Sequence, residues 1–340
     1  MSMMDTQVIV MAIVGVVAFF SAAALGKLLI PQLRRLHFGQ TIREEGPAWH
    51  QSKQGTPTMG GLIFIAVTAV VTLVTVLVCE LFTDHRVLTA SENAALKLFA
   101  PLLLALGCGV IGFADDFIKV VKKRNLGLTA KQKLIAQLLI SLTFSLLLYF
   151  ADSDTLRVPF FGDVKFGIWY IPFCVFTIIA MSNATNLTDG VDGLCTSVSF
   201  FATLPFIIIA GIVSAFGDGI LLVAFGGALA GFLLWNLHPA QVFMGDTGSL
   251  FIGGLLAGVA FALQQPFLLI PVGIVYILEN LSVILQVGYF KLTKGKRLFK
   301  MAPLHHHFEM CKWSENVIVF VFTAVTLLGC VGAMLLYFKA

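Results

Sequence analysis

The chain alternates between long apolar runs and short polar connections. A bilayer core about 30 Å thick requires about 20 apolar residues per crossing helix. Runs of roughly this length lie at 8–30, 59–80, 95–114, 131–151, 167–186, 196–214, 219–236, 248–264, 267–290 and 315–338. We therefore predict an all-α polytopic membrane protein with ten transmembrane helices, and a single integral-membrane domain over residues 1–340.

An even number of crossings puts both termini on the same side of the bilayer. One set of connections, with the helix ends beside it, holds 17 of the 22 Lys and Arg; it comprises 31–58, 115–130, 187–195, 237–247 and 291–314. Because basic residues concentrate in cytoplasmic loops, this set is predicted to be cytoplasmic and both termini external. On the external side, Gly162-Asp163 between β-prone residues predicts a short hairpin within 156–166.

Composition supports lipid as the main solvent. Hydrophobic residues make up 58% of the chain and charged residues only 12%, with a mean hydropathy of +0.94. These values exclude a disordered chain, a nucleic-acid-binding module and an ordinary cytosolic enzyme. The six cysteines form no CxxC pair and are predicted to be small buried apolar groups. No Walker A pattern occurs, so we expect no ATPase.

Adjacent acids end the third apolar run. Asp115 and Asp116 are followed by Lys119, Lys122 and Lys123. Two neighbouring carboxylates at a membrane surface repel each other and are costly to desolvate, so we favour function over a solvated helix end. Adjacent residues of a helix point about 100° apart, which predicts different roles for the two acids.

Carboxamide and carboxylate residues recur at every third position from residue 183, as Asn183, Asn186, Asp189 and Asp192. On a helix, neighbours at this spacing share a face. An Asn/Asp/Gly turn between helices is the alternative. We favour ligand binding, because a turn requires one or two such residues, and Gly190 would let a ligand approach the backbone.

Two further cytoplasmic segments carry candidate chemistry. Asp246 lies between glycines at a helix start, where it either caps the helix or holds a divalent cation. His305-His306-His307 follow a basic stretch over 294–300. Imidazoles beside cations suit phosphate groups; zinc binding and attraction to lipid headgroups are the alternatives, and the latter does not explain the histidines.

Acids, histidines, amides and most basic residues thus share one predicted face of the membrane. This combination favours a cytosol-facing phosphotransferase that joins a water-soluble phosphate compound to a lipid phosphate. Mg²⁺ would bridge phosphate oxygens, and a carboxylate would accept the proton of the attacking group.

The same residues resemble those of a known family. The resembling motifs are Phe38-Gly-Gln, Gly55-Thr-Pro-Thr-Met-Gly-Gly61, Asp115-Asp116, Asn186-Leu-Thr-Asp-Gly-Val-Asp-Gly-Leu194, Pro239-Ala-Gln-Val-Phe-Met-Gly-Asp246, Leu281-Ser-Val-Ile-Leu-Gln-Val287 and Met301-Ala-Pro-Leu-His-His-His-Phe-Glu309. Over nearly its full length the chain is similar to the phospho-N-acetylmuramoyl-pentapeptide transferase (MraY) family of the polyprenyl-phosphate N-acetylhexosamine-1-phosphate transferases. At position 280 the family pattern leads us to expect Thr, whereas this chain has Asn280.

The resemblance implies the reaction and its catalytic groups. Undecaprenyl phosphate would attack UDP-N-acetylmuramoyl-pentapeptide, giving UMP and lipid I. Asp246 would hold the Mg²⁺ cofactor, and Asp115 would be the base with Asp116 as its close partner. The residues that would contact phosphates or their surroundings are Lys119, Lys131, His305 and His306, with His305 counted as catalytic.

The resemblance also implies a uridine pocket, in which Phe243 would stack on uracil. Its lining would comprise Lys53, Asn236, Gly190 and Asp192, with Thr58, Asn186 and Asp189 beside it, where nucleoside antibiotics of this family bind. A homodimer in the bacterial inner membrane is a further expectation.

Other readings remain at this point. A transporter would carry ionisable residues near the bilayer midplane. The predicted spans are nearly free of charge; Glu279 and the edge residue Glu80 are the main exceptions, and we place Glu279 toward the cytoplasmic end of its helix. A sister transferase that moves N-acetylglucosamine-1-phosphate is the alternative enzyme. The sequence leaves open which Asp is the base, and whether the lipid phosphate attacks directly or through an aspartyl intermediate.

Overall fold

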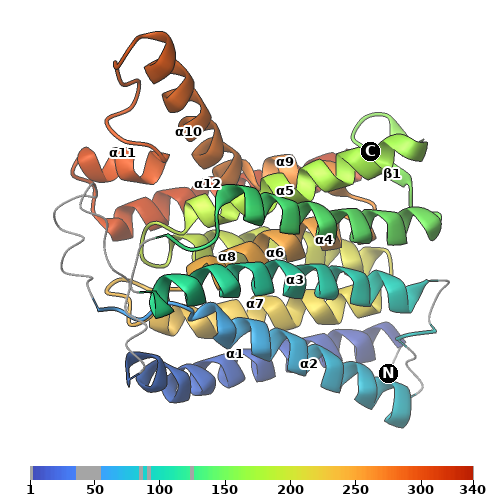
Figure 1. The fold of residues 1–340 in the computed structure, drawn as a ribbon. Helices are drawn as coiled ribbons and strands as arrows, with labels where there is room; N and C mark the ends of the chain where they lie inside the picture. Colours follow the sequence, from blue (N-terminus) through green and yellow to red (C-terminus); the bar gives the residue numbers. More distant parts are fainter. Residues whose placement is uncertain (1–2, 36–54, 84–86, 90–92, 123–125, 340) are drawn as a thin grey trace.

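The computed structural model describes residues 3–35, 55–83, 87–89, 93–122 and 126–339, and within them it is a bundle of long helices (Figure 1). The membrane-length helices are α1 (Met3–Arg35), α2 (Gly61–Phe82), α3 (Ala94–Val121), α4 (Ala130–Phe150), α5 (Tyr170–Thr188), α6 (Leu194–Ile212), α7 (Phe216–Asn236), α8 (Gly245–Ala262), α10 (Ile274–Leu292) and α12 (Glu315–Lys339). Shorter segments are η2 (Gly167–Trp169), η3 (Pro266–Leu268), α9 (Leu269–Val272) and α11 (Leu304–Met310).

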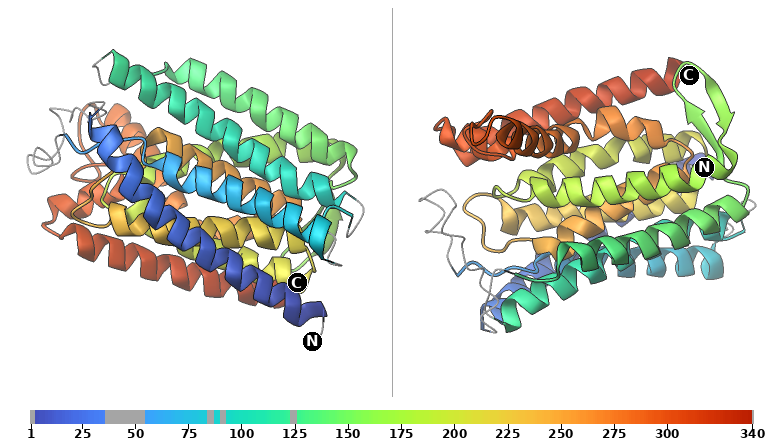
Figure 2. Two further views of the ribbon diagram at one scale, coloured as in Figure 1. Left: turned by 90° about the horizontal axis from the view of Figure 1, so that it is seen from below. Right: turned by 45° about the horizontal axis from the view of Figure 1, so that its top comes forward.

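The hydrophobic pattern predicts this architecture correctly. Ten helices in the described residues are long and apolar enough to cross a membrane. The two termini lie at the same end of the bundle, and α11 lies at the opposite end (Figures 1 and 2). The predicted hairpin is also present, as β1 (Thr155–Val158) paired antiparallel with β2 (Gly162–Lys165). The six cysteines are free thiols, five of them buried, as predicted.

Helix α8 forms the centre of the bundle. In the apolar 18-residue stretch of α8, 89% of the residues are buried; in the corresponding stretches of α1 and α10 the shares are 17% and 22%. The rings of Phe64 on α2, Phe225 and Phe232 on α7 and Phe251 on α8 pack together, with centroids 5.2–6.5 Å apart. The peripheral helices instead expose large apolar side chains, as a surface that faces lipid requires.

Most helix bounds differ from the predicted runs by a few residues, and two differences change the architecture. Helix α3 continues through the apolar residues after Asp116 to Val121, so the paired acids lie inside the helix rather than in a connection. The run predicted over 267–290 is divided at Gly273, where α9 ends and α10 begins. Pro266 and Pro271 lack the backbone N–H that a continuous helix requires. Helix α10 consequently projects from the bundle (Figure 1).

Candidate active site

The candidate site lies where α3 meets the start of α8. A Cβ on Gly112, one turn before Asp115, would collide with the backbone carbonyl of Asp246. Only glycine allows the two helices to approach this closely. The contact brings together Asp115 and Asp116 of α3 and Asp246 of α8, whose carboxylate oxygens lie within 4.8 Å of one another. We call these three residues the carboxylate cluster.

The two adjacent acids have different partners, as their angular separation predicts. Asp115 is 1% exposed, and its Oδ1 accepts a hydrogen bond from the backbone N–H of Leu128 at 2.7 Å. Asp116 is 3% exposed, and its Oδ2 accepts hydrogen bonds from the backbone N–H and the hydroxyl of Thr247 at 2.9 and 2.7 Å. Asp115 therefore holds the segment before α4, whereas Asp116 holds the first turn of α8.

Two lysines neutralise part of the cluster. The Lys119 Nζ lies 2.6 Å from Asp115 Oδ2 and 3.1 Å from Asp246 Oδ2. The Lys133 Nζ lies 3.0 Å from Asp115 Oδ1 and 2.6 Å from Asp246 Oδ2. Three ionised carboxylates and two ammonium groups leave one net negative charge.

Sequence reasoning named Lys131 as a phosphate contact and missed Lys133. Helix α4 begins after the capping box of Thr129 and Gln132, which fixes its first turn. Two residues along a helix rotate the side chain by about 200°, so Lys133 reaches the cluster while Lys131 is exposed on another face. A contact of Lys131 with substrate stays a prediction.

Asp246 does not cap its helix. Met244 is the residue before α8, and no side-chain hydrogen bond caps this end. The Asp246 Oδ1 instead accepts a hydrogen bond at 2.9 Å from Asn186 on α5, and Asn186 also donates to Ser249 Oγ at 2.9 Å. Together with Lys119 of α3 and Lys133 of α4, Asn186 fixes the Asp246 carboxylate from three different helices, which favours the predicted cation-binding role over the capping role.

The four polar residues that recur from Asn183 do not share one helix face. Helix α5 ends at Thr188, so the three-residue register holds only for Asn183 and Asn186. Asn183 lies one turn deeper and donates to Gln137 Oε1 on α4 at 3.1 Å. Asp189 and Asp192 belong to the turn before α6, which was the alternative reading.

Asp189 is the acid of this turn closest to the carboxylate cluster. Burial and, to a smaller extent, the negative charges of Asp246, Asp116 and Asp192 together raise its pKa to about 8, while a hydrogen bond from the backbone N–H of Gly245 opposes the shift. A carboxyl that keeps its proton near neutral pH adds no fourth charge to the cluster.

The Gly/Thr/Pro-rich entry into α2 supports the loop before α8. The backbone N–H of Phe243 donates to the carbonyl of Pro57, and the N–H of Gly60 donates to the carbonyl of Phe243, both at 2.8 Å. This pairing leaves the Phe243 side chain partly exposed and buries Thr58 beside Gly245. Both predicted ligand residues therefore lie at the edge of the site.

Asn236 and Lys53 complete the predicted uridine set. Asn236 is 2% exposed; its Oδ1 accepts from Thr196 Oγ1 at 2.6 Å and its Nδ2 donates to the carbonyl of Val242 at 3.0 Å. Its amide therefore fastens the loop before α8. Lys53 and the Phe38-Gly-Gln motif lie outside the described residues.

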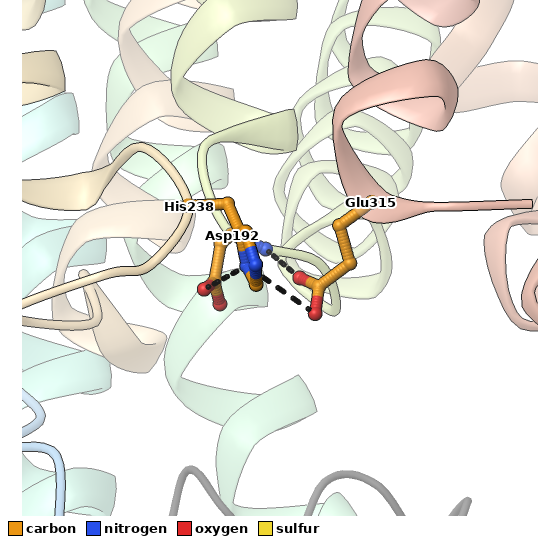
Figure 3. A group of neighbouring side chains, drawn as sticks. All are labelled: Asp192, His238 and Glu315. Carbon is orange, nitrogen blue, oxygen red and sulfur yellow. Dashed lines mark hydrogen bonds and ion pairs between the residues drawn. The ribbon is translucent and has the colours of Figure 1, made fainter.

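Asp192 joins a second cluster, with His238 and Glu315 (Figure 3). The Asp192 Oδ2 lies 3.1 Å from His238 Nδ1 and accepts from the backbone N–H of Ala240 at 3.0 Å. Glu315 Oε2 accepts from the backbone N–H of Asp192 at 3.1 Å, and Glu315 Oε1 lies 3.6 Å from His238 Nδ1. The cluster thus links the α5–α6 turn, the loop before α8 and the start of α12; sequence reasoning missed His238 and Glu315, which no motif marks.

The three consecutive histidines have separate partners. His305 is 1% exposed, and its Nδ1 lies 3.2 Å from Glu279 Oε1. The Nδ1 of His306 lies 2.6 Å from Glu309 Oε2, and the Nδ1 of His307 accepts from the backbone N–H of Lys300 at 3.2 Å. Because the three Nδ1 atoms contact three different partners, the zinc alternative is disfavoured. His306 is the more exposed of the two predicted phosphate contacts, whereas His305 is enclosed.

The carboxylate cluster has the chemistry that Mg²⁺ requires. Mg²⁺ takes oxygen ligands, commonly one or two carboxylates together with substrate phosphates. Asp246, Asp115 and Asp116 offer such oxygens within 4.8 Å of one another. The neighbouring Lys119 and Lys133 offer positive charge to phosphates. The arrangement can therefore bind a metal ion and a pyrophosphate side by side.

Comparison with known proteins agrees with this site. Residues 98–264 match the glycosyl transferase family 4 profile, and residues 53–65 match phospho-N-acetylmuramoyl-pentapeptide-transferase signature 1. A phospho-N-acetylmuramoyl-pentapeptide-transferase of Clostridium perfringens is 46% identical over 330 residues, covering 97% of this chain and 96% of the relative. Relatives of the same name from Halalkalibacterium halodurans and Bacillus thuringiensis are 47% and 49% identical, covering 92% and 91% of this chain and 93% and 92% of the relatives. The chain therefore belongs to the phospho-N-acetylmuramoyl-pentapeptide transferase family.

Proposed function

We propose that this protein transfers phospho-N-acetylmuramoyl-pentapeptide from its UDP nucleotide to undecaprenyl phosphate. The products are UMP and lipid I, the first lipid-linked intermediate of peptidoglycan synthesis. The observation that carries the proposal is the carboxylate cluster with Lys119 and Lys133 at one end of a membrane-spanning bundle. A site there can serve a water-soluble nucleotide and a membrane-bound phosphate at once. The names and high identity of the relatives support the same substrates.

Mg²⁺ is the proposed cofactor. Asp246 is the principal ligand, because Asn186 and two lysines already orient its carboxylate toward the centre of the site. Asp115 and Asp116 complete the oxygen-rich wall. When bound, the ion would neutralise negative charge that develops on the phosphate oxygens.

Asp115 is the proposed base. Its Oδ2 faces the Lys119 ammonium at 2.6 Å, whereas the Oδ2 of Asp116 is held by two hydrogen bonds from Thr247 of α8. Asp115 takes the proton of the lipid phosphate, whose oxygen forms a bond to the β-phosphorus. The bond from that phosphorus to the bridging oxygen breaks, and UMP leaves with the electron pair. Lys119 and Lys133 both contact Asp246, where their ammonium groups can stabilise the negative charge that shifts to the leaving phosphate.

The nucleotide and the lipid approach from different sides in this proposal. The uridine is received by Phe243 of the loop before α8 and by Gly190 and Asp192 of the α5–α6 turn. The polyprenyl chain lies along α10, which projects from the bundle and buries only Val275, Tyr276, Glu279 and Ser282. We also propose that the enzyme is a homodimer of the bacterial inner membrane, with the site on the cytoplasmic face, and that nucleoside antibiotics inhibit it.

Purified protein in detergent tests the proposal. We expect UMP release from UDP-N-acetylmuramoyl-pentapeptide only when both a polyprenyl phosphate and Mg²⁺ are present. Omitting each component in turn provides the controls. A preference for UDP-N-acetylglucosamine would instead assign the protein to the sister transferases.

A further inference from the structure

A buried acid–histidine pair lies between α10 and α11. Glu279 is 0% exposed and His305 is 1% exposed. The Glu279 Oε1 accepts a hydrogen bond from the backbone N–H of His305 at 3.2 Å, and the same oxygen lies 3.2 Å from Nδ1 of the His305 ring. Glu279 thus holds both the backbone and the ring of one residue.

The opposite side of the ring faces the turn after α5. A Cβ on Gly190 would overlap Nε2 of His305, so only glycine admits the ring at this position. Within the described residues, Nε2 of His305 and Oε2 of Glu279 make no hydrogen bond. A buried polar group left unsatisfied costs about 1–3 kcal/mol, so an arrangement with two such atoms calls for a role other than stability.

Gly190 connects this pair to the carboxylate cluster. It follows Asp189, whose carboxyl accepts a hydrogen bond from the backbone N–H of Gly245. Gly245 immediately precedes Asp246, the proposed metal ligand. A displacement of the His305 ring would therefore shift the Asp189–Gly190 turn and, through Gly245, the position of Asp246.

We propose that Glu279 is a positioning residue for the transfer reaction. Its carboxylate holds the His305 ring against Gly190, and this contact sets Asp189 and Gly245 beside Asp246. The inference rests on the proposed function and adds to it a residue that lies outside the carboxylate cluster. Outer-shell carboxylates that orient a metal-bound histidine typically contribute about 10- to 100-fold to activity, and we expect an effect of the same size here.

The test uses Glu279→Gln in the full-length protein. Glutamine keeps the shape and can still accept from the His305 backbone N–H, but it removes the negative charge beside Nδ1. We expect kcat to fall about 10- to 100-fold, with KM for the nucleotide within about threefold of the original value. We expect the thermal midpoint to stay the same. A merely structural link between α10 and α11 would instead lower the thermal midpoint together with the activity.

A double-mutant cycle isolates the link to His305. In a His305→Asn background, Glu279→Gln should have little further effect on kcat, because the group that it positions is gone. The matched control is Glu80→Gln: Glu80 accepts from the backbone N–H groups of Val87 and Leu88 at 2.6 Å, and we expect kcat to be unchanged.

The outcomes separate the two proposals. If the unmodified protein releases no UMP under any condition, the proposed function is wrong and the role of Glu279 falls with it. If the unmodified protein is active but Glu279→Gln retains its kcat, or if the two substitutions are additive, only the positioning role is wrong.

Discussion

Removal of the Lys133 charge provides the sharpest test of the site geometry. The Lys133 Nζ contacts Asp246 Oδ2 at 2.6 Å and Asp115 Oδ1 at 3.0 Å, and Asp115 is 1% exposed. Removing one partner of a buried ion pair costs about 3–5 kcal/mol. The lysine side chain is 23% exposed, so solvent screening reduces this to about 2–4 kcal/mol. Lys133→Met should therefore lower the free energy of unfolding by about 2–4 kcal/mol. Because the ammonium is also placed to stabilise charge on the transferred phosphate, the substitution should lower kcat by about 100- to 1,000-fold.

The assay is UMP release by purified protein at fixed Mg²⁺ and polyprenyl phosphate. Lys131→Met is the matched comparison, because it removes the same charge two residues away on another face of α4. We expect its effect to be at least about tenfold smaller. An equal or larger loss in Lys131→Met would refute the geometry and restore Lys131 as the phosphate contact.

Three further predictions address the metal, the helix contact and the turn acid. Asp246→Asn should abolish turnover and lower Mg²⁺ affinity; full activity at ordinary Mg²⁺ would contradict the metal assignment. Gly112→Val should destabilise the protein by about 1–3 kcal/mol, measured as a lower thermal midpoint, because its side chain must push the backbone of α8 away. Between about pH 4 and 8 the native state retains a proton on Asp189 that the unfolded chain has lost, so stability falls as pH rises. Asp189→Asn should flatten that fall in the thermal midpoint, and an unchanged slope would contradict the raised pKa.

Much of the architecture was predictable from local pattern. Apolar runs of membrane length predicted ten helices, and Gly162-Asp163 predicted the hairpin. The polar motifs between the apolar runs predicted Asp115, Asp116 and Asp246 as candidate site residues, and the structure brings these three together. Such features follow from the length of a hydrophobic run and from the cost of placing charge in lipid, neither of which depends on distant residues.

Side-chain direction required the tertiary structure. The choice of Lys133 over Lys131 depends on where α4 begins and on how it packs against α3. The separation of Asn183 from Asn186 depends on which helix lies opposite each turn of α5. The links from Asp192 to His238 and Glu315, and from Glu279 to His305, join segments far apart in the chain.

The sequence by itself thus determined the medium, the number of crossings and the residue types of the site. Each of these is set by composition and by local spacing along the chain. Only the tertiary structure decided which charges meet and which histidine is enclosed. One residue of helix turns a side chain by about 100°, and packing alone fixes what then lies opposite it.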